Sequence, residues 1–304
     1  MTKAKVAPDL KKLMTGAQLP ALPQSAIRLL ELSQDPENGP AEFAVPIESD
    51  PGLTGQVLRF VNSSYFGFSR EISSIKLAIT LVGIRTIKNF ALWSAVFSLM
   101  PNPKCGPFDL KSLWQDSLRR ALFARAFGKL MGMKDAEDLF AAALLQDMAV
   151  PLLARELPDQ YAELFNRCSS ESRRLSQLEQ EEFGWSHAQA AATMARHWSL
   201  PEEFAVLIEA HTELGSMMEN DQTPPSQLSV GLSSLLPAAH DPAWPDREEF
   251  ESAYQRILAN RETPLGGMLE RIDREFTEFA PVLKISTPVR SLVERLTEKA
   301  SVVA

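Results

Sequence analysis

The feature that most constrains this chain is the spacing of its apolar residues, which recur every three or four positions along nearly its whole length. In one stretch, for example, Leu53, Val57 and Val61 fall on one side of a helix. We find no convincing alternation of apolar and polar residues of the kind that is typical of a half-buried strand. The spacing therefore predicts an all-α protein.

Capping and breaking residues indicate where some of these helices begin and end. Ser73 is expected to cap a helix that ends at Gly83, a residue suited to a helix C-terminus. Residues 41–50 predict a short helix interrupted by Pro46. Residues 136–158 predict one long buried helix.

The stretch "MPNPKCGPFD", residues 100–109, is rich in proline and turn residues and divides the helices into two groups. We expect residues 19–104 to form an N-terminal helical lobe that packs on a second helical lobe over 105–240. Residues 1–18 are a short N-terminal segment, and residues 241–304 a C-terminal helical extension. A chain of 304 residues is long enough for such an arrangement.

Composition and charge restrict the class of protein. The chain is 45% hydrophobic and 23% charged, as is usual for a soluble globular protein. No apolar run approaches the roughly 20 residues of a membrane span, and no signal peptide is expected. The two cysteines, Cys105 and Cys168, are too few for a disulfide framework and favour a cytoplasmic location. The net charge of -8 argues against nucleic acid as the default partner.

Positive charge is nevertheless concentrated between residues 59 and 88, where Glu71 is the single acid. One interpretation is an ordinary solvated face, and the other is a basic docking patch for a partner. The residues of this candidate docking patch are Arg59, Arg70, Lys76, Arg85 and Lys88.

A Gln-Asp pair, Gln146 and Asp147, interrupts the apolar run "AAALLQDMAV" at residues 141–150. Burying a carboxylate costs several kcal/mol, roughly, unless hydrogen-bond or charge partners compensate it. We therefore expect Asp147 to accept hydrogen bonds from donors elsewhere in the chain. The candidates are His187, His211, either Arg119 or Arg120, backbone amides and an ordered water.

Several stretches, among them "NSSYFG", "ISSIKLAITLVGIRTI", "LLQDMAVPLL" and "FGWSHAQAAATMARHW", resemble in this order the HDOD domain (HD-related output domain). That family is a degenerate relative of the HD-domain and HD-GYP phosphohydrolases. The resemblance covers roughly residues 19 to 212, and we expect the domain to span 19–240. It implies a two-lobed helical fold and a role in bacterial cytoplasmic signalling, without a general catalytic activity.

The resemblance also implies a site. In active HD proteins, an adjacent His-Asp pair and further histidines hold divalent ions that polarise a phosphoryl oxygen. Here Gln146 replaces the histidine of that pair, and Asp116 stands where a metal-binding relative has another histidine. We therefore expect a vestigial HD-site cluster with no catalytic residue, no metal and no other cofactor. Its members are Asp116, Gln146, Asp147, His187 and His211.

The function expected from the sequence is a non-catalytic output or scaffold module that binds a signalling protein, or a nucleotide such as a cyclic dinucleotide. Two alternatives stay open. One is a metal-dependent phosphohydrolase or phosphodiesterase, for which Asp147, His187 and His211 would have to hold an ion. The other is a nucleic-acid-binding regulator that uses the basic helices around Gly83.

Overall fold

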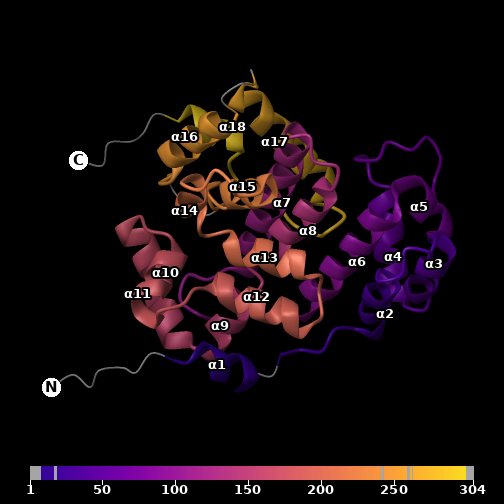
Figure 1. The fold of residues 1–304 in the computed structure, drawn as a ribbon, viewed down its shortest axis with the longest axis horizontal. Coiled ribbons are helices and arrows are strands. Elements are labelled where there is room, and N and C mark those ends of the chain that lie inside the picture. The colour runs from indigo at the N-terminus through magenta and orange to yellow at the C-terminus, as the bar shows by residue number, and fades with distance from the viewer. Residues whose placement is uncertain are drawn as a thin grey trace.

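The computed structural model of the chain shows a protein whose regular elements, in the part described, are all helices, as the apolar spacing predicts. The helices form two lobes that pack against each other (Figure 1). Within the described ranges, each helix is either too short or too polar to cross a lipid bilayer. The structure describes residues 8–16, 19–239, 241, 243–258, 261 and 263–298.

The first lobe lies at the right of Figure 1 and is built around the apolar faces of five consecutive helices. The Asp50 carboxylate accepts the amide of Leu53 at 3.0 Å and so starts the third of them. Gly83, with φ of 100°, separates the last two, in a conformation that side chains disfavour. The helices are α2 (Gln24–Leu32), α3 (Pro40–Glu48), α4 (Pro51–Val61), α5 (Ile75–Val82) and α6 (Ile84–Leu99).

Two local predictions in this lobe were wrong. The residue that caps α5 is Ser74, whose hydroxyl accepts the amide of Leu77, and not Ser73. Helix α3 continues through Pro46 without interruption. The proline removes one backbone hydrogen bond, but the buried side chains of Phe43 and Ile47 hold the helix against its neighbours.

The second lobe is arranged around the long helix α7 (Leu110–Leu130), which packs against α8, α15 and α17. Helices from the expected C-terminal extension belong to this lobe, because α17 lies along α7 (Figure 1). Its other helices are α8 (Ala136–Leu145), α9 (Val150–Glu156), α10 (Pro158–Glu171), α11 (Leu175–Phe183), α12 (His187–His197), α13 (Glu202–Ala210), α14 (Leu214–Met218), α15 (Pro225–Ser233), α16 (Arg247–Ile257), α17 (Leu265–Phe279) and α18 (Leu292–Thr297).

The prediction of one helix over 136–158 was wrong, and the difference matters for the site. Helix α8 ends at Leu145, residues 146–149 form a turn, and α9 begins at Val150. Pro151 lies in the first turn of α9, where its missing N–H leaves no helical bond unmade. Gln146 and Asp147 therefore occupy a corner between two helices and not the middle of a helix.

The two lobes pack against each other, as predicted, and polar and aromatic contacts join them. The Asn89 side chain of α6 donates to the carbonyl of Glu137 and to the carboxylate of Asp138, both at 3.1 Å. The ring of Tyr65, from the loop after α4, lies 4.3 Å from that of Phe279 on α17. The lobes are thus tied by contacts to both α8 and α17.

Residues 8–16 lie on the second lobe, although they precede the first lobe in sequence (Figure 1). Their helix α1 (Leu10–Gly16) packs on α12. The Trp185 indole donates to the carbonyl of Pro8 at 2.8 Å, and the Trp198 indole donates to that of Pro20 at 3.0 Å. Two tryptophans of the second lobe therefore hold the chain that leads into the first.

Candidate functional site

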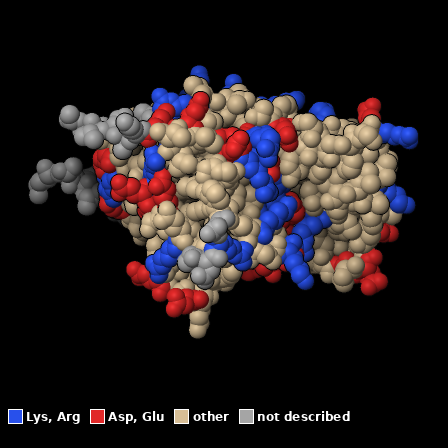
Figure 2. Space-filling model, turned by 90° about the horizontal axis from the view of Figure 1, so that it is seen from above, with Lys and Arg blue, Asp and Glu red and all other residues tan. Residues whose placement is uncertain are grey.

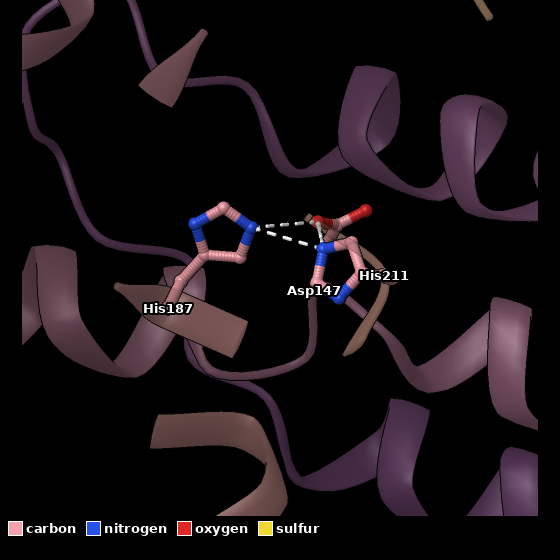
Figure 3. Close-up of side chains that lie close together, drawn as sticks. All are labelled: Asp147, His187 and His211. Atoms are coloured by element: carbon pink, nitrogen blue, oxygen red, sulfur yellow. Dashed lines mark hydrogen bonds and ion pairs between the residues drawn. The ribbon is translucent and has the colours of Figure 1, made fainter. Parts of the chain in front are cut away.

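Asp147, His187 and His211 meet at one point inside the second lobe (Figure 3). Asp147 lies at the corner between α8 and α9, His187 is the first residue of α12, and His211 follows the last residue of α13. The Nε2 atom of His187 lies 3.2 Å from Asp147 Oδ1 and 3.2 Å from His211 Nε2. His211 Nε2 lies 3.5 Å from Asp147 Oδ1. The structure thus brings these three predicted residues together.

The sequence interpretation missed Glu179, a fully buried carboxylate on α11 that contacts His187 from the other side. Its Oε2 accepts both the backbone amide of His187 at 2.7 Å and a bond from the ring Nδ1 at 2.6 Å. The Tyr161 hydroxyl donates to Oε1 at 2.6 Å. Glu179 therefore fixes the orientation of the His187 ring.

The partners of the two imidazoles define where their protons lie. The Nδ1 atom of His211 lies 2.6 Å from the carbonyl oxygen of Ile208, so that nitrogen carries a proton and donates. Burial alone would lower the pKa of His187, but the Glu179 and Asp147 carboxylates outweigh it and raise the pKa to about 10. Protonated His187 can then donate to Glu179 through Nδ1 and toward Asp147 through Nε2.

Arg120 of α7 forms an ion pair with Oδ2 of Asp147, and its positive charge offsets the cost of burying that carboxylate. Burial would raise the pKa of Asp147, but Arg120 and the two histidines hold it well below its ordinary value. Arg119, the other candidate partner, donates to the carbonyl of Arg290 instead. The buried cluster is thus a chain of alternating charges.

The other two predicted members of the cluster, Gln146 and Asp116, line the same cavity as these residues but make different hydrogen bonds. Gln146 is fully buried, and its Nε2 lies 3.5 Å from Asp147 Oδ2, at the limit of a hydrogen bond. Among the described residues, its Oε1 has no hydrogen-bond partner. Asp116 precedes Arg120 by one turn of α7 and accepts the backbone amide of Ala239 at 2.6 Å. Asp116 thus contributes to holding the segment after α15.

All five residues line a cavity of about 250 Å³ in the second lobe. Its walls come from the start of α7, the α10–α11 turn and the segment between α15 and α16. The cavity also contacts the partly buried rings of Phe108 and Phe165, which stack on each other. The cluster therefore faces a space that a small molecule can enter.

HD-type proteins imply a metal centre at this place, and three residues of the cluster could contribute ligands to it. One ligand atom each from Asp147, His187 and His211 lies within 4.8 Å of the others. However, the Arg120 guanidinium binds the Asp147 carboxylate and would repel a cation there. Gln146 offers a neutral amide in place of an imidazole. The set does not fit a two-metal hydrolytic centre.

The candidate docking patch lies in the first lobe, and its residues differ in their surroundings. Arg59, Arg70 and Lys76 are exposed, on α4, the following loop and α5. Arg85 forms ion pairs with Asp135 and with Asp138, the latter at 3.2 Å, so it contributes to the contact between the lobes. Burial lowers the pKa of Lys88. The docking patch stays a prediction.

Comparison with known protein families identifies the family of this chain. The family model of the HDOD domain matches residues 19–214. The chain belongs to the HDOD domain family. An uncharacterized protein of Treponema pallidum (strain Nichols) is 22% identical over 197 residues, which are 64% of this chain and 38% of that protein. The chain thus spans about two-fifths of the length of that curated relative.

Solved structures from bacteria share the fold. An HDOD domain protein of unknown function from Geobacter sulfurreducens has a TM-score of 0.70 at 21% identity, covering 91% of this chain and 97% of that chain. A candidate phosphohydrolase from Shewanella amazonensis SB2B has a TM-score of 0.67 at 20% identity, and the match covers 91% of this chain and 98% of that chain. A candidate signal transduction protein from Marinobacter aquaeolei VT8 has a TM-score of 0.67 at 18% identity, and the match covers 93% of this chain and 62% of that chain. At these identities, the likeness shows the fold alone.

Proposed function

We propose that this HDOD domain is a non-catalytic module of bacterial signal transduction that acts by binding a protein partner. The observation that carries this proposal is the ion pair between Arg120 and Asp147. A guanidinium stays charged throughout the physiological pH range, so it competes with any metal ion for that carboxylate. A metal-dependent hydrolase would need the carboxylate for its metal.

The surface of the first lobe favours a protein as the partner of this module. On the face seen in Figure 2, the right-hand end of the molecule is largely uncharged, with charged side chains at its margins. Large apolar side chains are exposed on the packed helices α3 and α5: Val45 (65%), Leu77 (44%) and Leu81 (49%). Exposed apolar groups of this size on one lobe favour a protein-binding surface.

Two further observations accord with a role in cytoplasmic signalling. The protein from Marinobacter aquaeolei that shares this fold is named as a candidate signal transduction protein. Cys105 and Cys168 are free thiols, as is usual in the cytoplasm. A cyclic dinucleotide is the second class of ligand that this proposal includes.

The alternative function is a phosphohydrolase. It is favoured by the convergence of Asp147, His187 and His211 within 4.8 Å and by the name of the Shewanella amazonensis protein. The two functions differ in metal content and in hydrolysis, and both can be measured directly.

The test uses the full chain purified without chelator. We expect no stoichiometric iron, manganese or zinc, and no hydrolysis of a generic phosphodiester or a cyclic dinucleotide with added manganese. Gln146→His should also stay inactive, because Asp116 and Arg120 are unchanged. A His197→Gln variant, altered at an exposed histidine of α12, is the matched control. A stoichiometric metal that disappears in Asp147→Ala, or hydrolysis by Gln146→His, would overturn the proposal.

A further inference from the structure

The cavity beside the cluster contains an acceptor with no partner from the described residues. Gln146 lines the cavity, is fully buried, and leaves its Oε1 without a hydrogen bond. The amide nitrogen faces Asp147, so the unpartnered atom is the carbonyl oxygen. A buried carbonyl oxygen without a donor is unfavourable, and a molecule in the cavity could supply the donor.

The charges around the cavity disfavour an anionic ligand. Arg120 interacts with three carboxylates, those of Asp147, Asp116 and Asp241, all of which line the cavity. The other two arginines at the cavity are also paired with acids. Arg173 bonds Glu181 at 3.0 Å, and Arg174 bonds Asp246 at 2.8 Å. A phosphate group would therefore meet more negative than positive charge.

The wall of the cavity favours a flat ring. The rings of Phe108 and Phe165 have centroids 5.5 Å apart and planes 27° apart. Both side chains are only partly buried, so an aromatic surface is available to a ligand. The volume of about 250 Å³ is below the roughly 300–1,000 Å³ of pockets for drug-sized molecules, which indicates a small ligand.

We propose that this cavity binds an uncharged planar nitrogen heterocycle of nucleobase or nucleoside size, with one of its N–H groups donating to Gln146 Oε1. The proposal rests on the proposed function, because it describes a ligand that the module binds without hydrolysing. It predicts that adding a phosphate to the same heterocycle weakens binding, the opposite of what a phosphohydrolase site requires.

The test is calorimetry of the full chain with guanosine and adenosine, each against its own monophosphate. We expect at least one nucleoside to bind, and its monophosphate to bind about tenfold more weakly or not at all. In Gln146→Met, which removes the acceptor at similar volume, binding of that nucleoside should fall about tenfold. The matched control is Gln255→Met, the same change at an exposed position of α16, which should bind like the parent.

Three results would overturn the proposal: no binding of either nucleoside, tighter binding of the monophosphate, or unchanged binding in Gln146→Met. Absence of binding would mean that water alone satisfies Gln146. Melting temperatures of both variants should match the parent, which separates loss of the ligand contact from loss of the fold. Phosphate release from a monophosphate in the same samples would contradict the proposed function and is read separately from the calorimetric result.

Discussion

Helix α7 carries Arg125, which is buried, and Arg120, which is partly buried, and the two side chains have different surroundings. Arg125 forms ion pairs with Glu275 at 2.8 Å and Glu137 at 3.6 Å. Its guanidinium also lies 4.9 Å from the ring centres of both Tyr65 and Phe140 and 5.5 Å from that of Phe279. These residues belong to the first lobe, α8 and α17, so one cation joins three separate segments.

Arg120 is paired with Asp147 but borders a cavity instead of aromatic rings. Its Nε atom has no hydrogen-bond partner among the described residues, and neither has Oε1 of the adjacent Gln146. The two arginines share a residue type and a helix. The difference teaches that an ion pair alone does not separate a structural arginine from one at a cavity, and the unfilled bonding capacity at Arg120 and Gln146 is the observation behind the proposed binding site.

The largest expected effect is at Arg125. Arg125→Met removes the partner of two acids and the cation between the rings, so we expect a loss of about 3–5 kcal/mol in the free energy of unfolding. Urea unfolding measures this. Arg28→Met, which breaks the exposed pair with Glu31, is the control and should cost less than about 1 kcal/mol. Equal urea midpoints for the two variants would show that Arg125 does not stabilise the packing of the two lobes.

A smaller loss, about 1–3 kcal/mol, is expected for Asp147→Ala. The substitution leaves His187 and Arg120 without this acceptor, but Asp116 and Asp241 still compensate part of the guanidinium charge. The control is Asp221→Ala, at an exposed carboxylate in the turn after α14. If Asp147→Ala unfolds at the same urea concentration as the parent, the cluster contributes nothing to stability.

Over a change of a single pH unit, the smallest effect is that of His187 titration, at about 1 kcal/mol. The folded pKa of His187, about 10, exceeds the ordinary value of 6.5. The protonated ring therefore stabilises the fold fully below pH 6.5, and this stabilisation is lost as pH rises toward 10. Urea midpoints across that range should fall in the parent and in His197→Gln but fall less in His187→Gln. Equal slopes in all three would rule out His187 as the cause.

Much of the fold could be predicted because apolar spacing reports directly on which side of each helix is buried. The corner at residues 146–149 was missed because apolar residues continue on both sides of it. Pro151 was the available signal, since proline fits the first turn of a new helix better than the interior of an old one. The family resemblance supplied Asp147, His187 and His211, which the structure brings together.

Other parts of the site were harder to predict. Glu179 left one signal: it lies four residues from both Leu175 and Phe183, so it falls within the apolar stripe of its helix. Arg119 and Arg120 could not be separated, because neighbouring residues of a helix point in different directions that only the fold defines. The cavity had no local signal, since its walls come from segments that meet only in the folded chain.

The hydrogen bonds of Trp185 and Trp198 to Pro8 and Pro20 bear on how the chain folds while it is synthesised. Each hydrogen bond joins residues 177 or 178 positions apart. A ribosome that adds roughly 5–20 residues per second would release each proline about 9–35 s before its tryptophan partner emerges. The first lobe can assemble during that interval, because its contacts are closer in sequence. Pro8 and Pro20 would therefore reach their native places only after the residues that follow them in the first lobe.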